Sequence, residues 1–205
     1  MAIDLSSISG LILAGGLGRR MSSAGQSTDK GLTLFKDKTM VAHVIERLAP
    51  QLSGSLLINC NQNALAYQTI APAGSTMVPD QIEGFAGPLA GLEAGLTAAM
   101  LIDGNEWLVT APCDTPFLPL NLVEQFVYHA NAKQVDLLVA RDKTQVHPVF
   151  MMVHQSVLPN LRAYLASGER KVDRWYCALK HTAVTFEDAH AFSNINTPLE
   201  LKRLE

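Results

Sequence analysis

Short apolar segments alternate with segments of helical periodicity along most of this chain. The segments predicted as strands are residues 11–13, 55–58, 75–78, 107–110, 135–140, 148–153 and 182–186. Most intervals between them carry apolar residues at helical spacing, as in residues 40–48, a helix that Thr39 can cap. Strands that alternate with helices form a mainly parallel sheet covered on both faces. We therefore predict an α/β fold, a three-layer α/β/α Rossmann-like sandwich.

One pair of strands departs from this alternation. Residues 135–140 and 148–153 are separated only by the polar segment RDKTQVH. That segment is long enough for a hairpin but too short for the crossover helix that parallel neighbours need. We therefore expect one strand of this pair to run against the others.

The composition limits the size and the partners of the protein. The chain has 205 residues, of which 48% are hydrophobic, so it can bury one sizeable core and is short for two. We predict a single domain, residues 1–205. The net charge of -3 argues against a protein that coats nucleic acid or an anionic membrane. No apolar run approaches the length of a membrane span, and the first residues do not resemble a signal peptide.

The cysteines indicate the compartment. Cys60, Cys113 and Cys177 are odd in number, widely spaced and outside any CxxC pattern. This pattern favours neither a disulfide framework nor a zinc ribbon. We therefore expect the protein in the reducing cytoplasm.

The first predicted strand runs directly into a glycine-rich turn. The residues at this turn are Ala14, Gly15, Gly16 and Gly18, and the cations that follow it are Arg19, Arg20 and Lys30. A backbone without bulky side chains can approach a ligand closely, and amide donors beside fixed cations can bind a polyanion. The spacing matches neither GxxxxGK[ST] nor the third glycine of GxGxxG. The pattern alone leaves open a simple turn between strand and helix.

Three later strands also end in polar residues, namely Asn59, Asp80 and Asp114. In open α/β sheets, ligands bind outside the carboxyl ends of the strands. Asp114, in the segment PCDTP, is the best candidate for a Mg²⁺ ligand, with a turn or N-cap role as the alternative. Asp80 could lie near the metal or accept hydrogen bonds from a base or ribose. Asn59, in competition with Asn61, could bind a base edge.

The sequence offers no well-placed general base or nucleophile. The histidines lack metal-ligand spacing, so His147 and His154 are interpreted as ordinary core or surface residues. The serines after the glycine turn lie outside any GxSxG context. A phosphate that acts as the attacking group is already ionised, and positioning with charge neutralisation would then supply most of the catalysis.

A series of motifs resembles the molybdenum cofactor guanylyltransferases, which join GMP from GTP to molybdenum-molybdopterin. The motifs are LAGG at 13–16, RRM at 19–21, DKG at 29–31, HV at 43–44, NCN at 59–61, VPD at 78–80, GPLAG at 87–91, PCDTP at 112–116, HPV at 147–149, GERKV at 168–172 and NINTP at 194–198. They span nearly the whole chain in the family's order. The fold that this resemblance implies is the nucleotide-diphospho-sugar transferase type of sandwich.

The resemblance also implies roles for individual residues. The nucleotide side would comprise Leu13, Ala14, Gly15, Gly16, Lys30, Asn59, Asp80 and Asp114, with Asp114 also holding Mg²⁺. Asp114, Lys30 and Arg19 would be the catalytic residues, and Gly87, Pro88, Asn194 and Asn196 would face the pterin. The implied substrates are GTP and molybdenum-molybdopterin. We further expect a monomer that can meet molybdenum-insertion and molybdoenzyme-maturation proteins.

Two features bear on these roles. The link SSAGQST between RRM and DKG is longer and richer in serine than the family's usual link, which affects where Arg19 and Arg20 lie. Relatives that use CTP have LAAG and DQP at the points where this chain has LAGG and PCDTP, so these motifs favour GTP.

The alternative functions are a cytidylyl- or sugar-phosphate nucleotidyltransferase and a non-catalytic module that binds and delivers the pterin. A dehydrogenase is the weakest alternative, because the third fingerprint glycine is absent.

Overall fold

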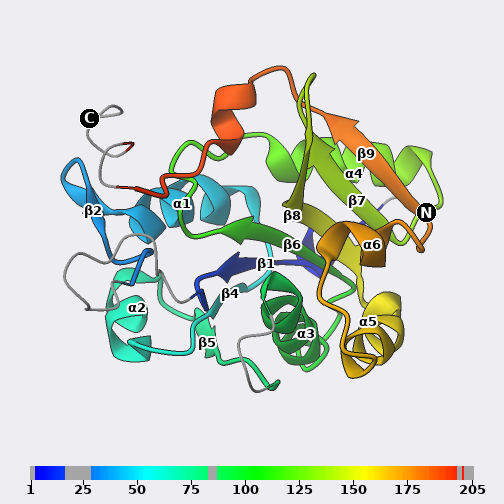
Figure 1. Cartoon of the computed structure of the whole chain (residues 1–205), viewed down its shortest axis with the longest axis horizontal. Coiled ribbons are helices and arrows are strands. Elements are labelled where there is room, and N and C mark those ends of the chain that lie inside the picture. Colours follow the sequence, from blue (N-terminus) through cyan, green and yellow to red (C-terminus); the bar gives the residue numbers. More distant parts are fainter. Residues whose placement is uncertain (1–2, 17–28, 83–86, 198–199, 201–205) are drawn as a thin grey trace.

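The computed structural model describes residues 3–16, 29–82, 87–197 and 200. Its main feature is a seven-stranded sheet with the strand order β5-β4-β1-β6-β8-β7-β9 (Figure 1). In chain order the strands are β1 (Ile8–Leu13), β4 (Leu56–Asn59), β5 (Thr76–Val78), β6 (Trp107–Pro112), β7 (Leu137–Arg141), β8 (Val146–His154) and β9 (His181–Thr185). Every strand predicted from the sequence is present, with ends that shift by a few residues.

The strand directions match the predicted mixed sheet. β1 pairs in parallel with β4 and β6, β4 with β5, and β7 with β9. β8 alone among these strands runs antiparallel to its neighbours β6 and β7. The expected reversal within residues 135–153 is therefore confirmed. Its cause is the short connection between β7 and β8, which forces a hairpin.

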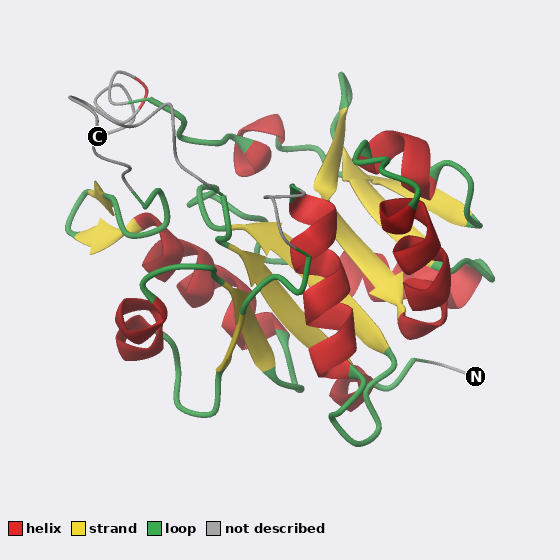
Figure 2. Cartoon of the chain, turned by 60° about the horizontal axis from the view of Figure 1, so that its bottom comes forward, coloured by secondary structure: helices red, strands yellow, loops and turns green. Residues whose placement is uncertain are grey.

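Helices cover both faces of the sheet (Figure 2). One face packs against α1 (Met40–Leu48), α2 (Ala64–Ile70) and α4 (Leu122–Ala132), and the other against α3 (Pro88–Ala99), α5 (Leu158–Ala166) and α6 (Val172–Tyr176). Successive residues of β6 alternate between the two cores, with Leu108 in the α3 core and Val109 in the α1 core. This alternation follows from the twofold period of a strand. The predicted three-layer α/β/α sandwich is confirmed.

The start of α1 shows how local sequence sets an element boundary. Thr39 lies in extended conformation before the helix, and its side chain accepts a hydrogen bond from the backbone N–H of Ala42. The helix then buries Val41, Val44 and Leu48 on one side. The predicted cap and the predicted apolar face are both present.

Several short elements were not predicted from the sequence. A two-stranded hairpin, β2 (Leu34–Phe35) and β3 (Lys38–Thr39), turns through Lys36, whose φ is 53°. Strands of two residues are too short to show a period. The 3₁₀ turns are η1 (Leu5–Ser7), η2 (Ala49–Gln51), η3 (Gln155–Val157) and η4 (Ala189–Phe192). The helix expected after residue 197 lies mostly outside the described residues.

In the described ranges, none of the helices is long and apolar enough to cross a membrane.

Candidate active site

The carboxyl ends of β1, β4, β5 and β6 meet along one edge of the sheet. The register places Leu13 beside Asn59 on one side and Pro112 on the other. Beyond the strands, the N–H of Ala14 donates to the carbonyl of Asn59 at 2.8 Å, and the N–H of Cys113 donates to the carbonyl of Leu13 at 3.1 Å. The glycine turn therefore lies between the segments that carry Asn59 and Asp114.

Two asparagines hold one carboxylate at this edge. The Nδ2 of Asn59 donates to Asp80 Oδ1 at 2.8 Å and to the carbonyl of Val78 at 3.0 Å. The Nδ2 of Asn61 donates to Asp80 Oδ2 at 2.8 Å, and its Oδ1 accepts from the N–H of Asp80 at 2.8 Å. Asn59 is 2% exposed, whereas Asn61 is exposed. The two asparagines that the sequence left as competitors therefore act together on Asp80.

Two glycines leave room for this cluster. A Cβ added at Gly15 would lie 2.8 Å from Asn61 Nδ2 and 2.9 Å from Asn59 Oδ1. A Cβ added at Gly91, on α3, would lie only 2.3 Å from Asn59 Oδ1. At Gly16, by contrast, an added Cβ would meet no described atom within 4 Å. Gly15 and Gly91 are thus needed for close packing around Asn59, whereas Gly16 has no such neighbour among the described residues.

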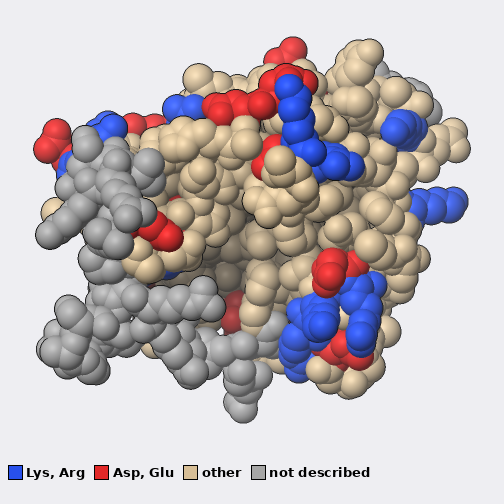
Figure 3. All heavy atoms as spheres, turned by 45° about the horizontal axis from the view of Figure 1, so that its top comes forward, with Lys and Arg blue, Asp and Glu red and all other residues tan. Residues whose placement is uncertain are grey.

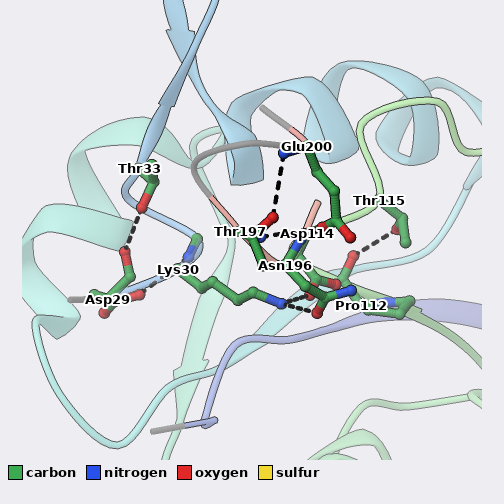
Figure 4. Close-up of polar contacts among 10 residues, drawn as sticks. Asp29, Lys30, Thr33, Pro112, Asp114, Thr115, Asn196, Thr197 and Glu200 are labelled. Atoms are coloured by element: carbon green, nitrogen blue, oxygen red, sulfur yellow. Dashed lines mark hydrogen bonds and ion pairs between the residues drawn. The ribbon is translucent and has the colours of Figure 1, made fainter. Parts of the chain in front are cut away.

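A second cluster joins three distant parts of the chain (Figure 4). The Nζ of Lys30 forms an ion pair with Asp114 Oδ2 and donates to Asn196 Oδ1 at 2.5 Å. The partners lie 84 and 166 residues from Lys30 along the chain. The side chains of Lys30 and Asp114 are only 17% and 10% exposed. The attraction within a largely buried ion pair of this kind is strong, because little water screens it.

Lys30 is held in place through its neighbour Asp29. The Oδ1 of Asp29 accepts from Tyr67 OH at 2.5 Å and from the N–H of Gly31 at 3.2 Å, and its Oδ2 accepts from Asn63 Nδ2 at 3.0 Å. Tyr67 is fully buried, and burial is the main reason why its pKa is raised far above the ordinary value. Asp29 therefore fixes the backbone at Lys30 to α2.

The sequence reading did not single out Asp29 or Tyr67. The available signals were the acid next to Lys30 in DKG and a tyrosine in a helix with few other large apolar residues. Neither signal shows that α2 packs beside residues 29–31, since that contact exists only in the folded chain.

Asn196 is positioned by the segment around it. The N–H of Ile195 donates to the carbonyl of Asp114 at 3.0 Å. The N–H of Asn196 donates to Glu200 Oε2 at 2.7 Å, and the N–H of Glu200 donates to Thr197 Oγ1 at 3.2 Å. The N–H of Thr197 also donates to Glu200 Oε2, at 3.1 Å, so Thr197 and Glu200 bond reciprocally, as in a capping box. The bond from Ile195 ties the asparagine segment to Asp114, just beyond the end of β6.

Comparison with known proteins shows the family of this chain. Residues 10–183 match the family model described as MobA-like NTP transferase domain. The molybdenum cofactor guanylyltransferase of Cupriavidus pinatubonensis is 42% identical over 97% of this chain and 96% of its own length. The protein of the same name from Bordetella petrii is 40% identical, with 98% and 99% covered. The chain belongs to the molybdenum cofactor guanylyltransferases. The family resemblance inferred from the motifs is confirmed.

Solved structures show the same fold. Molybdopterin-guanine dinucleotide biosynthesis protein A from Archaeoglobus fulgidus superimposes with a TM-score of 0.74 at 22% identity, covering 96% of each chain. The 4-diphosphocytidyl-2C-methyl-D-erythritol synthase of Anaerococcus prevotii gives a TM-score of 0.71 at 13% identity, with 98% and 97% covered. This guanylyltransferase family member is thus a nucleotidyltransferase with the predicted fold, and its family uses nucleoside triphosphates.

The remaining residues named from the sequence lie at the same edge or outside the described part of the guanylyltransferase. Gly87 and Pro88 are exposed at the start of α3, where Gly87 has a φ of 75° that favours glycine. Asn194 is exposed in the segment that precedes Asn196. Gly18, Arg19, Arg20 and the link SSAGQST lie outside the described residues.

Asp114 offers one carboxylate for a metal ion. Across residues 3–16, 29–82, 87–197 and 200, the structure brings no three His, Cys, Asp or Glu side chains together as a metal-binding group. The carboxylate already faces a cation, the ammonium of Lys30. Hard oxygen donors of this kind suit Mg²⁺, which usually takes one or two carboxylates together with water and substrate phosphates. The donor set therefore fits a Mg²⁺ ion that enters with a nucleotide.

Two thiols next to the site are not nucleophiles. Burial raises the pKa of Cys60 to about 11 and also raises the pKa of Cys113, where the charge of Asp114 adds to the effect. Only the thiolate is strongly nucleophilic, so both side chains stay inert at neutral pH. The structure therefore offers binding and charge at this edge, in line with transfer to a group that is already ionised.

Figure 3 shows the molecule turned by 45° from the view of Figure 1, so that the top of that view comes forward. Near the centre of this view is a hollow whose upper and right-hand sides are formed mostly by uncharged residues, and most of the charged side chains lie toward the outline of the molecule.

Proposed function

We propose that this guanylyltransferase transfers GMP from GTP to the terminal phosphate of molybdenum-molybdopterin. A phosphate oxygen of the pterin forms a bond to the α-phosphorus of GTP, the bond from that phosphorus to the bridging oxygen breaks, and pyrophosphate leaves. The relatives named above support the substrates. The observation that carries the proposal is the ion pair between Lys30 and Asp114, next to the glycine turn that follows β1.

On the nucleotide side, the backbone of Leu13, Ala14, Gly15 and Gly16 lies along the triphosphate. Asp80 accepts hydrogen bonds from the guanosine, because guanine and ribose both offer donors and a carboxylate accepts only. Asn59 and Asn61 hold that carboxylate in one orientation. The buried amide of Asn59 therefore acts on the nucleotide through Asp80.

At the reacting phosphates, Asp114 would hold Mg²⁺, which supplies charge neutralisation when bound. The ammonium of Lys30 forms charge-assisted hydrogen bonds to phosphate oxygens. In the structure its ammonium is held by Asp114 and Asn196. Arg19 is proposed as a further cation for the triphosphate. Since a phosphate attacks, the site needs no general base.

On the acceptor side, Asn194, Asn196, Gly87 and Pro88 face the pterin. These residues come from two segments that approach the same strand ends, the start of α3 and the segment bonded to Asp114. We also propose that residues 1–205 form one domain and act as a monomer in the cytoplasm, where the three free cysteines stay reduced. Molybdenum-insertion and molybdoenzyme-maturation proteins are the proposed protein partners.

Substitution of Asp114 tests the proposal. Asp114→Ala is expected to abolish pyrophosphate release from GTP and molybdenum-molybdopterin while the protein stays folded. The control is Asp103→Ala, which removes an exposed aspartate in the loop after α3, far from the carboxyl ends of the strands. Addition of EDTA to the wild-type protein is expected to stop release, and Mg²⁺ to restore it. Mg²⁺-dependent release by Asp114→Ala would remove Asp114 from the metal site.

Substitution of Lys30 and a comparison of nucleotides complete the test. Lys30→Ala loses a charge-assisted hydrogen bond, so the dissociation constant for GTP is expected to rise about 10-fold to 100-fold. An unchanged dissociation constant for GTP would exclude Lys30 from the phosphate site.

A comparison of nucleotides tests the alternative functions. Faster turnover with CTP than with GTP would favour a cytidylyltransferase. GTP that binds but is never consumed would favour a delivery module.

A further inference from the structure

A buried carboxylate orients a histidine in the hairpin between β7 and β8. Asp142 is 2% exposed, and its Oδ1 accepts from the N–H and the hydroxyl of Thr144, both at 2.6 Å, and from the N–H of Gln145 at 2.8 Å. Its Oδ2 lies 2.9 Å from His147 Nε2. The hydrogen bonds from Thr144 are the main reason why the pKa of Asp142 is held far below its usual range. Asp142 is therefore a fixed anion that holds one ring nitrogen of His147.

The His147 ring also stacks on one phenylalanine, Phe192, and meets a second, Phe150, edge-on at 6.3 Å. The rings of His147 and Phe192 are 4.3 Å apart and inclined by only 13°. Phe192 is held in turn by Phe150 at 4.9 Å and Phe186 at 5.3 Å. Phe192 ends η4, the orange-red turn beside the β7–β8 hairpin in Figure 1. The ring of His147 is thus one of three rings that hold Phe192 at the end of η4.

An irregularity in the pairing of β8 with β7 lies next to His147. The register with β7 changes between Val139, which faces Met151, and Ala140, which faces His147. On the other side of β8, the regular pairing with β6 ends at Thr110, whose hydroxyl donates to the carbonyl of Val149 at 2.6 Å. Bulges of this kind redirect side chains next to active sites.

Phe192 begins the segment that carries the two acceptor-side asparagines. Residues 193–196 run from the His147 stack to Ile195, which is buried with Phe35 and Met40 and bonded through its N–H to the carbonyl of Asp114. The segment is therefore held at one end by the stack of Phe192 on His147 and at the other by the hydrogen bond from Ile195 to Asp114. Asn194 is exposed between these two points.

We propose that His147, oriented by Asp142, is a positioning residue for the acceptor substrate, because its stack on Phe192 sets the place of Asn194 and Asn196. This role rests on the proposed function, in which those asparagines face the pterin. The position needs an imidazole for two reasons. A phenylalanine would stack but would leave Asp142 Oδ2 without its partner, and a glutamine would bond to Asp142 but could not stack.

Kinetics with both substrates test this role. His147→Ala is expected to raise KM for molybdenum-molybdopterin by about tenfold or more, from the loss of a stack and a charge-assisted hydrogen bond. KM for GTP is expected to rise several-fold less, because Lys30 loses at most its bond to Asn196 and keeps its ion pair with Asp114. His147→Phe and His147→Gln each restore one contact and are expected to fall between wild type and His147→Ala. The matched control is His154→Ala, which removes the same side chain from the other end of β8, where it lies edge-on to Trp107 at 4.9 Å.

Hydrogen exchange gives a second readout that does not depend on activity. The Ile195 amide is expected to exchange faster in His147→Ala than in wild type, while its rate in His154→Ala is unchanged. Equal increases of KM for both substrates, or an unchanged KM for the acceptor, would overturn the role. Should the wild-type protein not turn over these substrates, the proposed function fails, and unchanged Ile195 exchange in His147→Ala would still refute the positioning separately.

Discussion

Gly91 offers a test of how α3 packs against the nucleotide side of the site. In Gly91→Ala the new Cβ would lie 2.3 Å from Asn59 Oδ1 and 2.7 Å from Leu13 Cδ2. Asn59 cannot simply turn away, because it is 2% exposed and bonded to Val78 and Asp80. Overpacking of this kind costs about 1–3 kcal/mol. The higher helix propensity of alanine offsets about 1 kcal/mol.

The net change in the free energy of unfolding is then a loss of about 0–2 kcal/mol. For a chain of this length, each kcal/mol lowers Tm by about 2–4 °C, so Tm is expected to fall by at most ~8 °C. The larger effect is on binding. Displacement of Asn59 removes one of the two amides that orient Asp80, and loss of a hydrogen bond to a charged group is expected to weaken GTP binding about tenfold or more.

Gly95→Ala is the matched control on the same helix. Its Cβ would lie 2.3 Å from Leu11 Cδ2, so it also overpacks a buried contact, but with an apolar side chain away from the site. Thermal unfolding and GTP titration of both variants separate packing from binding. Both are expected to lose similar stability, and only Gly91→Ala is expected to lose GTP affinity. GTP binding by Gly91→Ala that equals that of Gly95→Ala would refute the reasoning.

Two further predictions concern groups around the site. Tyr67→Phe removes the hydroxyl that donates to Asp29 and is expected to weaken GTP binding several-fold through the backbone at Lys30; a loss of stability with unchanged GTP affinity would contradict this. At pH 8, only about 0.1% of Cys60 is thiolate at a pKa of about 11, so the exposed Cys177 is expected to react first with a disulfide reagent and the buried thiols only after unfolding. Rapid labelling of Cys60 in the native protein would show that this part of the core opens.

The motifs and the strand pattern predicted much of the site. Asn59, Asp80 and Asp114 each follow an apolar strand, and parallel strands bring their carboxyl ends to one edge. The sequence thus predicted that these residues gather, although it assigned no contact between them. The role of His147 was missed, because neither a stacked phenylalanine nor a buried carboxylate partner shows as a spacing pattern.

The sequence by itself determined the fold class, the family and the edge of the sheet where the candidate site residues gather, because burial, chain direction and motif order are properties of local segments. Only the tertiary structure decided that Lys30 meets both Asp114 and Asn196, and that Asn59 and Asn61 share Asp80. Such contacts depend on strand order and register, which bring together residues that are far apart in the chain and follow no repeating pattern in the sequence. The physical reason is that periodicity records which side of an element is buried, whereas a pairing between distant side chains is fixed only when the whole core packs.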